Sequence, residues 1–213
     1  MFREHLEFFR QFRTQFQTTG SIVPSSRYLA RAMTAQIAAP RGPARILEVG
    51  PGTGAVTSRI LKLLQKGDRL DLVELNESFA NHLRERFRDD PVFQLGASQA
   101  QVQVCGIETF NSEAPYDFIV SGLPFANFSA PFVDQLLNAM FRLLAPGGRL
   151  TYFEYMYMRS IRKVVSGQTE RNRLTDLDRV LNGFLSRHRM SRDSVLLNFP
   201  PAWVQHLQKQ PNP

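Results

Sequence analysis

The sequence predicts an α/β fold in which a mostly parallel sheet carries helices on both faces. Apolar, strand-like runs alternate along the chain with segments whose apolar residues recur at helical spacing, a pattern typical of a parallel sheet. The chain has 213 residues and 43% hydrophobic content, enough for one well-cored domain. We expect this domain to cover residues 18–213, after a separate helix over residues 1–17.

Seven strands are expected, the last two forming an antiparallel hairpin around Pro200-Pro201. Their expected ranges are 44–49, 70–74, 102–105, 116–120, 149–155, 195–199 and 203–207. The first strand is followed by a helix that reaches about Leu64, and Asn76 is positioned to cap the next one. Another helix is expected over residues 131–144, ending at Pro146-Gly147-Gly148. Residues 159–173 form a polar, basic segment, followed by a helix that carries Leu177 and Leu181.

A glycine-rich turn follows the first strand and is the most informative stretch of the chain. It reads Glu48-Val49-Gly50-Pro51-Gly52-Thr53-Gly54. Glycine allows positive φ and close approach of the backbone to a ligand. The spacing differs from the Gly-x-Gly-x-x-Gly of dinucleotide-binding folds. About 20 residues later, Glu74 ends the second strand, where a carboxylate can accept the hydroxyls of a ribose.

This turn is similar to the first motif of the class I S-adenosylmethionine-dependent methyltransferases. The resemblance implies a Rossmann-like sheet and S-adenosylmethionine as the cofactor, with Gly106 and Ile107 flanking the adenine. The family usually has an acidic residue at that point, whereas here Glu108 comes slightly later. The cofactor-binding residues expected on this basis are Ser21, Glu48, Gly50, Pro51, Gly52, Thr53, Gly54, Glu74, Leu75, Gly106, Ile107 and Ser121.

The segment after the fourth strand, Ser121-Gly122-Leu123-Pro124-Phe125, resembles the Asn-Leu-Pro-Tyr motif of ribosomal RNA adenine dimethylases. Gly122 stands in place of the asparagine and Phe125 in place of the tyrosine. The lone pair of an aromatic amine is delocalised, and an amide acceptor helps to free it; Gly122 cannot supply one. An aliphatic amine needs instead space, orientation and a proton acceptor, and Phe125 can hold its positive charge by cation–π attraction.

The whole chain resembles the bacterial phospholipid N-methyltransferases, which methylate phosphatidylethanolamine. The resemblance rests on four motifs in order: Thr19–Arg27, Glu48–Gly54, Ser121–Pro124 and Asn198–Val204. It implies an acceptor site that includes Ser121, Gly122, Leu123 and Tyr155, with Arg27 and Phe125 on the lipid. An aromatic-rich run from Tyr152 to Tyr157 departs from the family pattern.

Charge and the N-terminal pattern agree with an anionic membrane surface as partner. The formal net charge is +7, which nucleic acid would match equally well. On a helical wheel one face of residues 1–17 gathers Phe2, Leu6, Phe9, Phe12 and Phe16. Such a face suits a bilayer interface, and packing against the domain is the alternative. The basic residues of segment 159–173 either add to this attraction or form a solvated loop.

We expect a cytoplasmic enzyme that associates peripherally with the inner membrane. The chain has a single cysteine, Cys105, so we expect no disulfide, and it has no apolar signal region. Its four histidines are scattered and do not have the spacing of metal ligands, so we expect no metal. Two alternatives stay open: an RNA adenine dimethylase, and a protein that binds the cofactor without catalysis. The first lacks a basic C-terminal domain to hold RNA.

Overall fold

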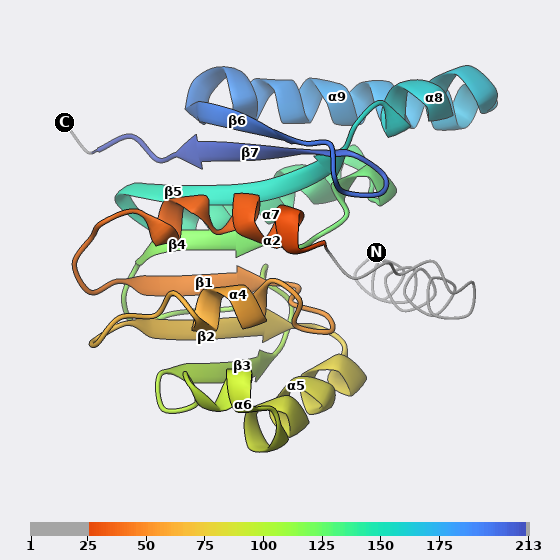
Figure 1. Ribbon diagram of the computed structural model, residues 1–213. Coiled ribbons are helices and arrows are strands. Elements are labelled where there is room, and N and C mark those ends of the chain that lie inside the picture. The colour runs from red at the N-terminus through yellow and green to blue at the C-terminus, as the bar shows by residue number, and fades with distance from the viewer. Residues whose placement is uncertain (1–25, 212–213) are drawn as a thin grey trace.

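The computed structural model describes residues 26–211 and contains the expected sheet (Figure 1). Seven strands lie in the order β3-β2-β1-β4-β5-β7-β6. The first five are parallel to one another, whereas β7 is antiparallel to both β5 and β6. The strands are β1 (Arg45–Val49), β2 (Arg69–Glu74), β3 (Ala100–Val104), β4 (Tyr116–Ser121), β5 (Leu144–Tyr155), β6 (Arg189–Val195) and β7 (Ala202–Gln208).

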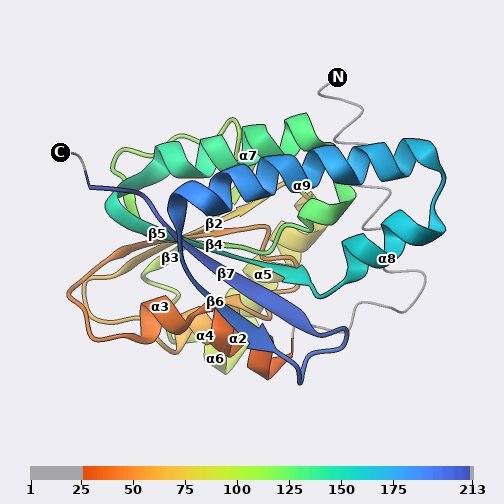
Figure 2. The ribbon, with the colours of Figure 1, turned by 90° about the horizontal axis from the view of Figure 1, so that it is seen from above.

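Helices cover both faces of the sheet, as Figure 2 shows. The helices are α2 (Arg27–Met33), α3 (Ala35–Ala38), α4 (Thr57–Leu61), α5 (Glu77–Asp89), α6 (Pro91–Gln94), the 3-10 turn η1 (Phe125–Asn127), α7 (Ala130–Leu143), α8 (Met158–Val165) and α9 (Gln168–His188). One apolar core lies between the sheet and helices α7 and α9, and a second lies under α2, α4, α5 and α6. Strands buried on both faces read as near-continuous apolar runs, which explains why the sequence predicts the fold class.

One expected helix is shorter than predicted. Gly54 has φ +83°, outside the helical region, and α4 begins only at Thr57; it ends at Leu61 rather than near Leu64. Helix α7 ends at Leu143, and β5 begins at once with Leu144. Its early part pairs with β4 through a register shift, so the Pro-Gly-Gly turn lies within the strand. Asn76 caps the N-terminus of α5, as expected, because its side chain accepts hydrogen bonds from main-chain N–H groups of that helix.

Two features of the C-terminal part of the chain differ from the alternatives or limits expected from the sequence. A solvated loop over residues 159–173 is one of two alternatives that the sequence leaves open, and these residues instead lie in α8 and the first part of α9, apart from the connection at 166–167. The hairpin is present, but β6 runs over Arg189–Val195, and residues 196–201 form its turn. Six of the seven β6 residues are exposed, so this edge strand lacks the apolar alternation that would reveal it. Pro200 and Pro201 carry no N–H and cannot continue a ladder.

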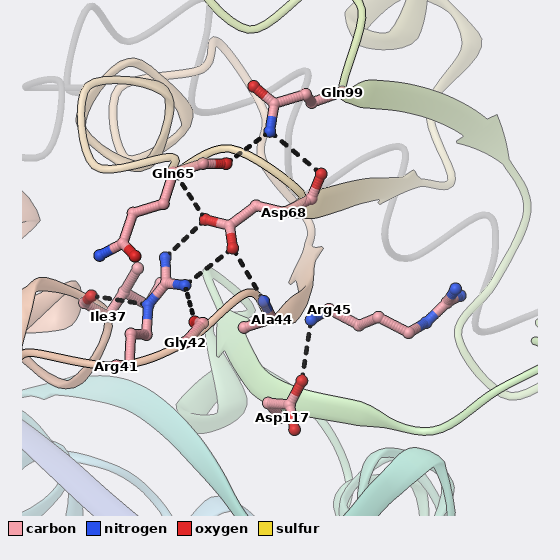
Figure 3. A network of polar contacts seen from close by, with 9 residues as sticks. All are labelled: Ile37, Arg41, Gly42, Ala44, Arg45, Gln65, Asp68, Gln99 and Asp117. Carbon is pink, nitrogen blue, oxygen red and sulfur yellow. Dashed lines mark hydrogen bonds and ion pairs between the residues drawn. The ribbon is translucent and has the colours of Figure 1, made fainter.

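A buried ion pair fastens the amino-terminal side of the sheet (Figure 3). The guanidinium of Arg41 donates two hydrogen bonds to the carboxylate of Asp68, at 2.8 and 2.6 Å. Asp68 also accepts bonds from the backbone N–H groups of Ala44 and Gln65. Burial alone would raise the pKa of Asp68, but these bonds outweigh it and lower the pKa below its ordinary value. The ion pair therefore joins the connections before β1 and before β2.

Candidate active site

The site lies where β1, β2 and β4 end, and main-chain hydrogen bonds hold these ends together. Gly50 donates its N–H to the carbonyl of Val73 at 2.9 Å, and Gly122 donates to the carbonyl of Val49 at 2.8 Å. The three strand ends therefore form one rigid ledge at the carboxyl edge of the sheet. In doubly wound folds this edge is where ligands bind.

The glycine-rich turn depends on glycine at each of its three positions. Gly50, Gly52 and Gly54 have φ values of 68°, 59° and 83°, in the left-handed region that other residues rarely adopt. At Gly54 a Cβ would also lie 2.7 Å from the ring of Phe93. The backbone therefore bends back on itself and forms a cradle in which main-chain atoms are uncovered at the three glycines.

Two buried carboxyl groups stand behind this turn. Glu74 is fully buried and accepts hydrogen bonds from the N–H groups of Gly52, at 3.0 Å, and Asn76, at 2.9 Å. Glu48 accepts a bond from the hydroxyl of Thr57 at 2.7 Å. Burial raises the pKa of Glu48 to about 8, the hydrogen bond from Thr57 lowers it, and the charge of Glu74 raises it further. Glu48 is therefore largely protonated at neutral pH. Its predicted role in orienting the turn would be performed by the neutral carboxyl group.

A largely apolar hollow opens beside Glu74. Leu75, Gly106 and Ile107, which the resemblance assigns to the nucleoside end of the cofactor, all line it. The wall also contains side chains that the sequence did not assign to the site, among them Val49, Val73, Cys105, Phe128, Phe132 and Leu136. Phe132 and Leu136 are four residues apart and lie on one face of α7. From sequence alone, apolar residues at this spacing indicate a helix face that packs in the core.

Glu108 supplies the acidic group that the family pattern places earlier in the chain. A Cβ on Gly106 would overlap the carboxylate of Glu108, so this side chain folds back over the glycine. Glu108 also lines the hollow. The acidic side chain that comes slightly later in the sequence therefore lies at the same wall of the hollow as Gly106 and Ile107.

Gly122 has a steric role that the motif alone does not reveal. A Cβ at this position would lie 2.7 Å from the carbonyl oxygen of Gly50, a backbone atom that cannot move aside easily. An asparagine therefore does not fit here without separating the ends of β1 and β4. Next to it, Ser121 is fully buried, and its hydroxyl accepts a bond from the N–H of Leu123 at 3.3 Å.

The acceptor-side residues do not all meet at the hollow. Leu123 lines it, but Phe125 is only 3% exposed and packs on Tyr152, with ring centroids 5.1 Å apart. Tyr155 ends β5, three residues after the strand partner of Ser121, and its ring packs on Phe153. Neither residue is among those that line the hollow.

Arg27, the other residue expected on the lipid, is exposed at the start of α2. Its guanidinium donates to the hydroxyl of Tyr28 at 3.0 Å and is not among the groups that line the hollow. Ser21 lies outside the described residues. The roles of these side chains toward a substrate stay predictions.

The basic residues of α8 and α9 hold the loop after β4. Arg162 donates to the side chain of Asn127 at 3.0 Å, and Arg173 donates to the carbonyl of Ala126 at 2.9 Å. Lys163 and Arg159 form ion pairs with Asp178 of α9. These charges are largely engaged within the protein, which leaves less of them for an acidic surface than the sequence suggested.

The residues gathered at this edge of the sheet fit S-adenosylmethionine. The glycine cradle can receive the amino-acid end of the cofactor, Glu74 stands at the level of a ribose, and the apolar hollow with Glu108 at its wall suits an adenine. Sheet order and cradle together define the class I methyltransferase fold.

Comparison with known proteins agrees with this geometry. The family model "Methyltransferase domain" matches residues 46–148. An ornithine lipid N-methyltransferase of Singulisphaera acidiphila is 32% identical over 152 residues, which are 67% of this chain and 75% of that protein. The chain belongs to the class I S-adenosylmethionine-dependent methyltransferase family, and its cofactor is S-adenosylmethionine.

Two other similarities are more partial. The ribosomal RNA small subunit methyltransferase A of Parasynechococcus marenigrum is 34% identical over 102 residues, 48% of this chain but only 32% of that protein. The structure of the N-methyltransferase NodS from Bradyrhizobium japonicum, in complex with S-adenosyl-L-homocysteine, superposes with a TM-score of 0.57. It is 16% identical, over 95% of this chain and 87% of that one, which shows a shared fold.

Proposed function

We propose that this enzyme transfers methyl groups from S-adenosylmethionine to the amine of a membrane lipid, phosphatidylethanolamine or its partly methylated forms. The observation that carries the proposal is Gly122. Because a Cβ at this position would collide with the carbonyl of Gly50, position 122 offers no side-chain amide to the methyl acceptor. That arrangement suits an aliphatic amine better than an aromatic one. The similarity to an ornithine lipid N-methyltransferase supports a lipid amine as acceptor.

The cofactor supplies an electrophilic methyl group on a positively charged sulfur. The protein's part is to hold an amine nitrogen in line with that methyl group and to exclude water. Ser121, Gly122 and Leu123 provide main-chain carbonyls at the strand end that can orient a neutral amine and accept its hydrogen bonds. Holding a nucleophile in a productive position accounts for several kcal/mol of a reaction barrier, on the order of 7–11 kcal/mol in favourable cases.

Tyr155 has a narrower role in this scheme than a proton acceptor. Burial raises the pKa of its phenol, so the hydroxyl keeps its proton at neutral pH. It can therefore donate a hydrogen bond to a phosphate oxygen of the lipid, while Arg27, exposed on the same face of the sheet, can supply a charge. The amine proton leaves through main-chain carbonyls and water.

A lipid profile tests the proposal. We expect a bacterial host that lacks phosphatidylcholine to accumulate mono-, di- or trimethylated phosphatidylethanolamine when it expresses this chain, as separated by thin-layer chromatography. A host that also makes ornithine lipid distinguishes the two amine headgroups, since each methylated product migrates separately. An unchanged lipid profile in a strain that contains folded protein would contradict the proposal.

Attachment to the membrane is part of the same proposal. No helix within residues 26–211 is long and apolar enough to span a bilayer. Residues 1–17, the predicted amphipathic helix, lie outside the described residues. We propose that this segment docks on the cytoplasmic face of the inner membrane, and that its deletion reduces co-sedimentation with anionic vesicles. Unreduced sedimentation of the deletion variant would exclude this role.

A ribosomal RNA adenine dimethylase is the second candidate, supported by the net charge of +7 and by the 34% identity to a ribosomal RNA methyltransferase. Gly122 opposes it, because the asparagine of that motif has no room here. Methyl transfer to ribosomal RNA and not to lipid would reverse the ranking. Cofactor binding without transfer to either would favour a non-catalytic binding protein.

A further inference from the structure

The turn between β6 and β7, residues 196–201, exposes an unusual amount of apolar surface. Leu196 and Leu197 are each 70% exposed and Phe199 is 82% exposed. No charged residue occurs between Ser194 and Trp203. We call residues 196–199 the hairpin tip. Single exposed apolar residues are common on proteins, but three of them within four positions indicate an interaction site.

The hairpin tip is held in place by hydrogen bonds on both sides. The side chain of Asn198, itself buried, donates to the carbonyl of Pro200 at 2.6 Å and accepts from the N–H of Ser26 at 3.3 Å. The N–H of Met156 donates to the carbonyl of Pro201 at 2.8 Å. The fold thus presents these apolar side chains on a fixed loop joined to α2 and to the end of β5.

The hairpin tip lies on the same edge of the molecule as the active site. Ala202, which follows the turn, pairs with Tyr155 at the end of β5, and Tyr152 of that strand pairs with Ser121. Figure 1 shows the β6–β7 turn on the side toward which β1 and β4 point, and the glycine-rich turn follows the end of β1. A surface that met the hairpin tip would therefore also meet the opening through which an acceptor enters.

Aromatic and basic side chains lie directly behind the apolar residues. Trp203 packs edge-on against Tyr157, with ring centroids 5.4 Å apart, and the guanidinium of Arg192 lies 4.9 Å from the tryptophan ring. Tyr157 is 63% exposed. Tryptophan and tyrosine favour the headgroup level of a bilayer, and arginine attracts anionic lipids. Apolar side chains in front, an aromatic belt behind them and a cation beside it match the layers of a lipid interface.

We infer that the hairpin tip inserts into the interface of an anionic bilayer and holds the active-site edge of the enzyme against the headgroups. Three side chains on one turn fall well short of the roughly 800 Å² per partner that a stable protein interface buries. Insertion into lipid needs no such area, since each apolar side chain gains by leaving water on its own. The inference deepens the proposed function and rests on it only for the identity of the headgroup.

The test uses the full chain and its single tryptophan, Trp203, as an internal reporter. The probe is a vesicle of phosphatidylglycerol and phosphatidylethanolamine in equal parts. We expect the tryptophan emission to shift to shorter wavelength on binding and to be quenched by lipids brominated near the headgroup. The variant Leu196→Ser/Leu197→Ser/Phe199→Ser should partition into these vesicles at least about tenfold more weakly, with unchanged melting temperature.

Leu95→Ser is the matched control, because Leu95 is 67% exposed next to α6, by β3 at the opposite edge of the sheet. It should bind vesicles like the wild type. On a short-chain phosphatidylethanolamine below its micelle concentration, the triple variant should keep wild-type turnover. Wild-type partitioning of the triple variant would overturn the inference. So would a shift of its oligomeric state in sedimentation velocity without a loss of vesicle binding, which would assign the hairpin tip to a second copy.

These measurements separate the two proposals. Vesicle binding that depends on the hairpin tip, without methyl transfer to any lipid, would contradict the proposed function and leave the docking surface standing. Lipid methylation with unchanged partitioning of the triple variant would support the proposed function and contradict the docking role of the hairpin tip.

Discussion

Glu48 gives a prediction whose magnitude follows from its surroundings. In the folded protein its carboxyl group has a pKa raised to about 8 by burial, against an ordinary value of 4.5. A group with a raised pKa binds its proton more tightly in the folded state, so it favours folding below about pH 4.5 and progressively less as the pH rises to about 8. Replacing it with glutamine removes this dependence and keeps an acceptor for the hydroxyl of Thr57.

The expected difference is large enough to measure. Each pH unit between the two pKa values costs about 1.36 kcal/mol, so at neutral pH the wild type loses roughly 3 kcal/mol that Glu48→Gln retains. For a domain of this size, the melting temperature of the variant minus that of the wild type should therefore be about 6–12 °C larger near pH 7 than near pH 4.

Differential scanning fluorimetry of both proteins over this pH range provides the measurement. Any cost from an unsatisfied amide of glutamine is independent of pH and appears at both ends, so only the change with pH tests the reasoning. A difference in melting temperature that stays constant from about pH 4 to pH 8 would refute the buried, protonated state of Glu48.

Three further predictions concern other parts of the fold. Gly122→Asn should lower stability by about 1–3 kcal/mol and weaken cofactor binding, since the new side chain meets the carbonyl of Gly50; tight binding by calorimetry would contradict the steric reading. Asp68→Asn should cost about 3–5 kcal/mol near neutral pH because it leaves Arg41 without its partner. Since the pKa of Asp68 is lowered in the fold, that stabilisation disappears as the pH falls through it, and urea melts of variant and wild type should converge in acid. Glu74→Gln should weaken S-adenosylmethionine binding in calorimetry and also lower the melting temperature, since its amide nitrogen would face the N–H of Gly52 or Asn76; unchanged affinity would remove Glu74 from the site.

The sequence predicts the sheet well because its central strands are buried on both faces. Strand β1 and the glycine turn are specified locally, by an apolar run and by residues that alone tolerate positive φ. The limits of edge strand β6 could not be predicted, because nearly all of its side chains face water and show no alternation of apolar and polar residues. The helical state of residues 159–173 depends on ion pairs with α9 and on contacts with the loop after β4, which only the folded chain brings together.

In the candidate site, too, the features set by local sequence could be predicted and those set by long-range contacts could not. The glycine turn and the carboxylates at the strand ends follow from motif and spacing, whereas the hydrogen bond from the N–H of Gly52 to Glu74 does not. The wall of the hollow does not, because Phe132 reaches it from α7, a helix far along the chain. The obstacle to a side chain at Gly122 is likewise a contact between two strand ends and is invisible to any local pattern.

One competition experiment addresses the substrate. Purified full-length protein is given methyl-labelled S-adenosylmethionine together with phosphatidylethanolamine vesicles and protein-free small-subunit ribosomal RNA, and the two fractions are separated and counted. We expect the label in the lipid amine, and we expect Gly52→Val to abolish it. Label in the RNA, or in neither fraction with cofactor bound, would contradict a lipid amine as the acceptor.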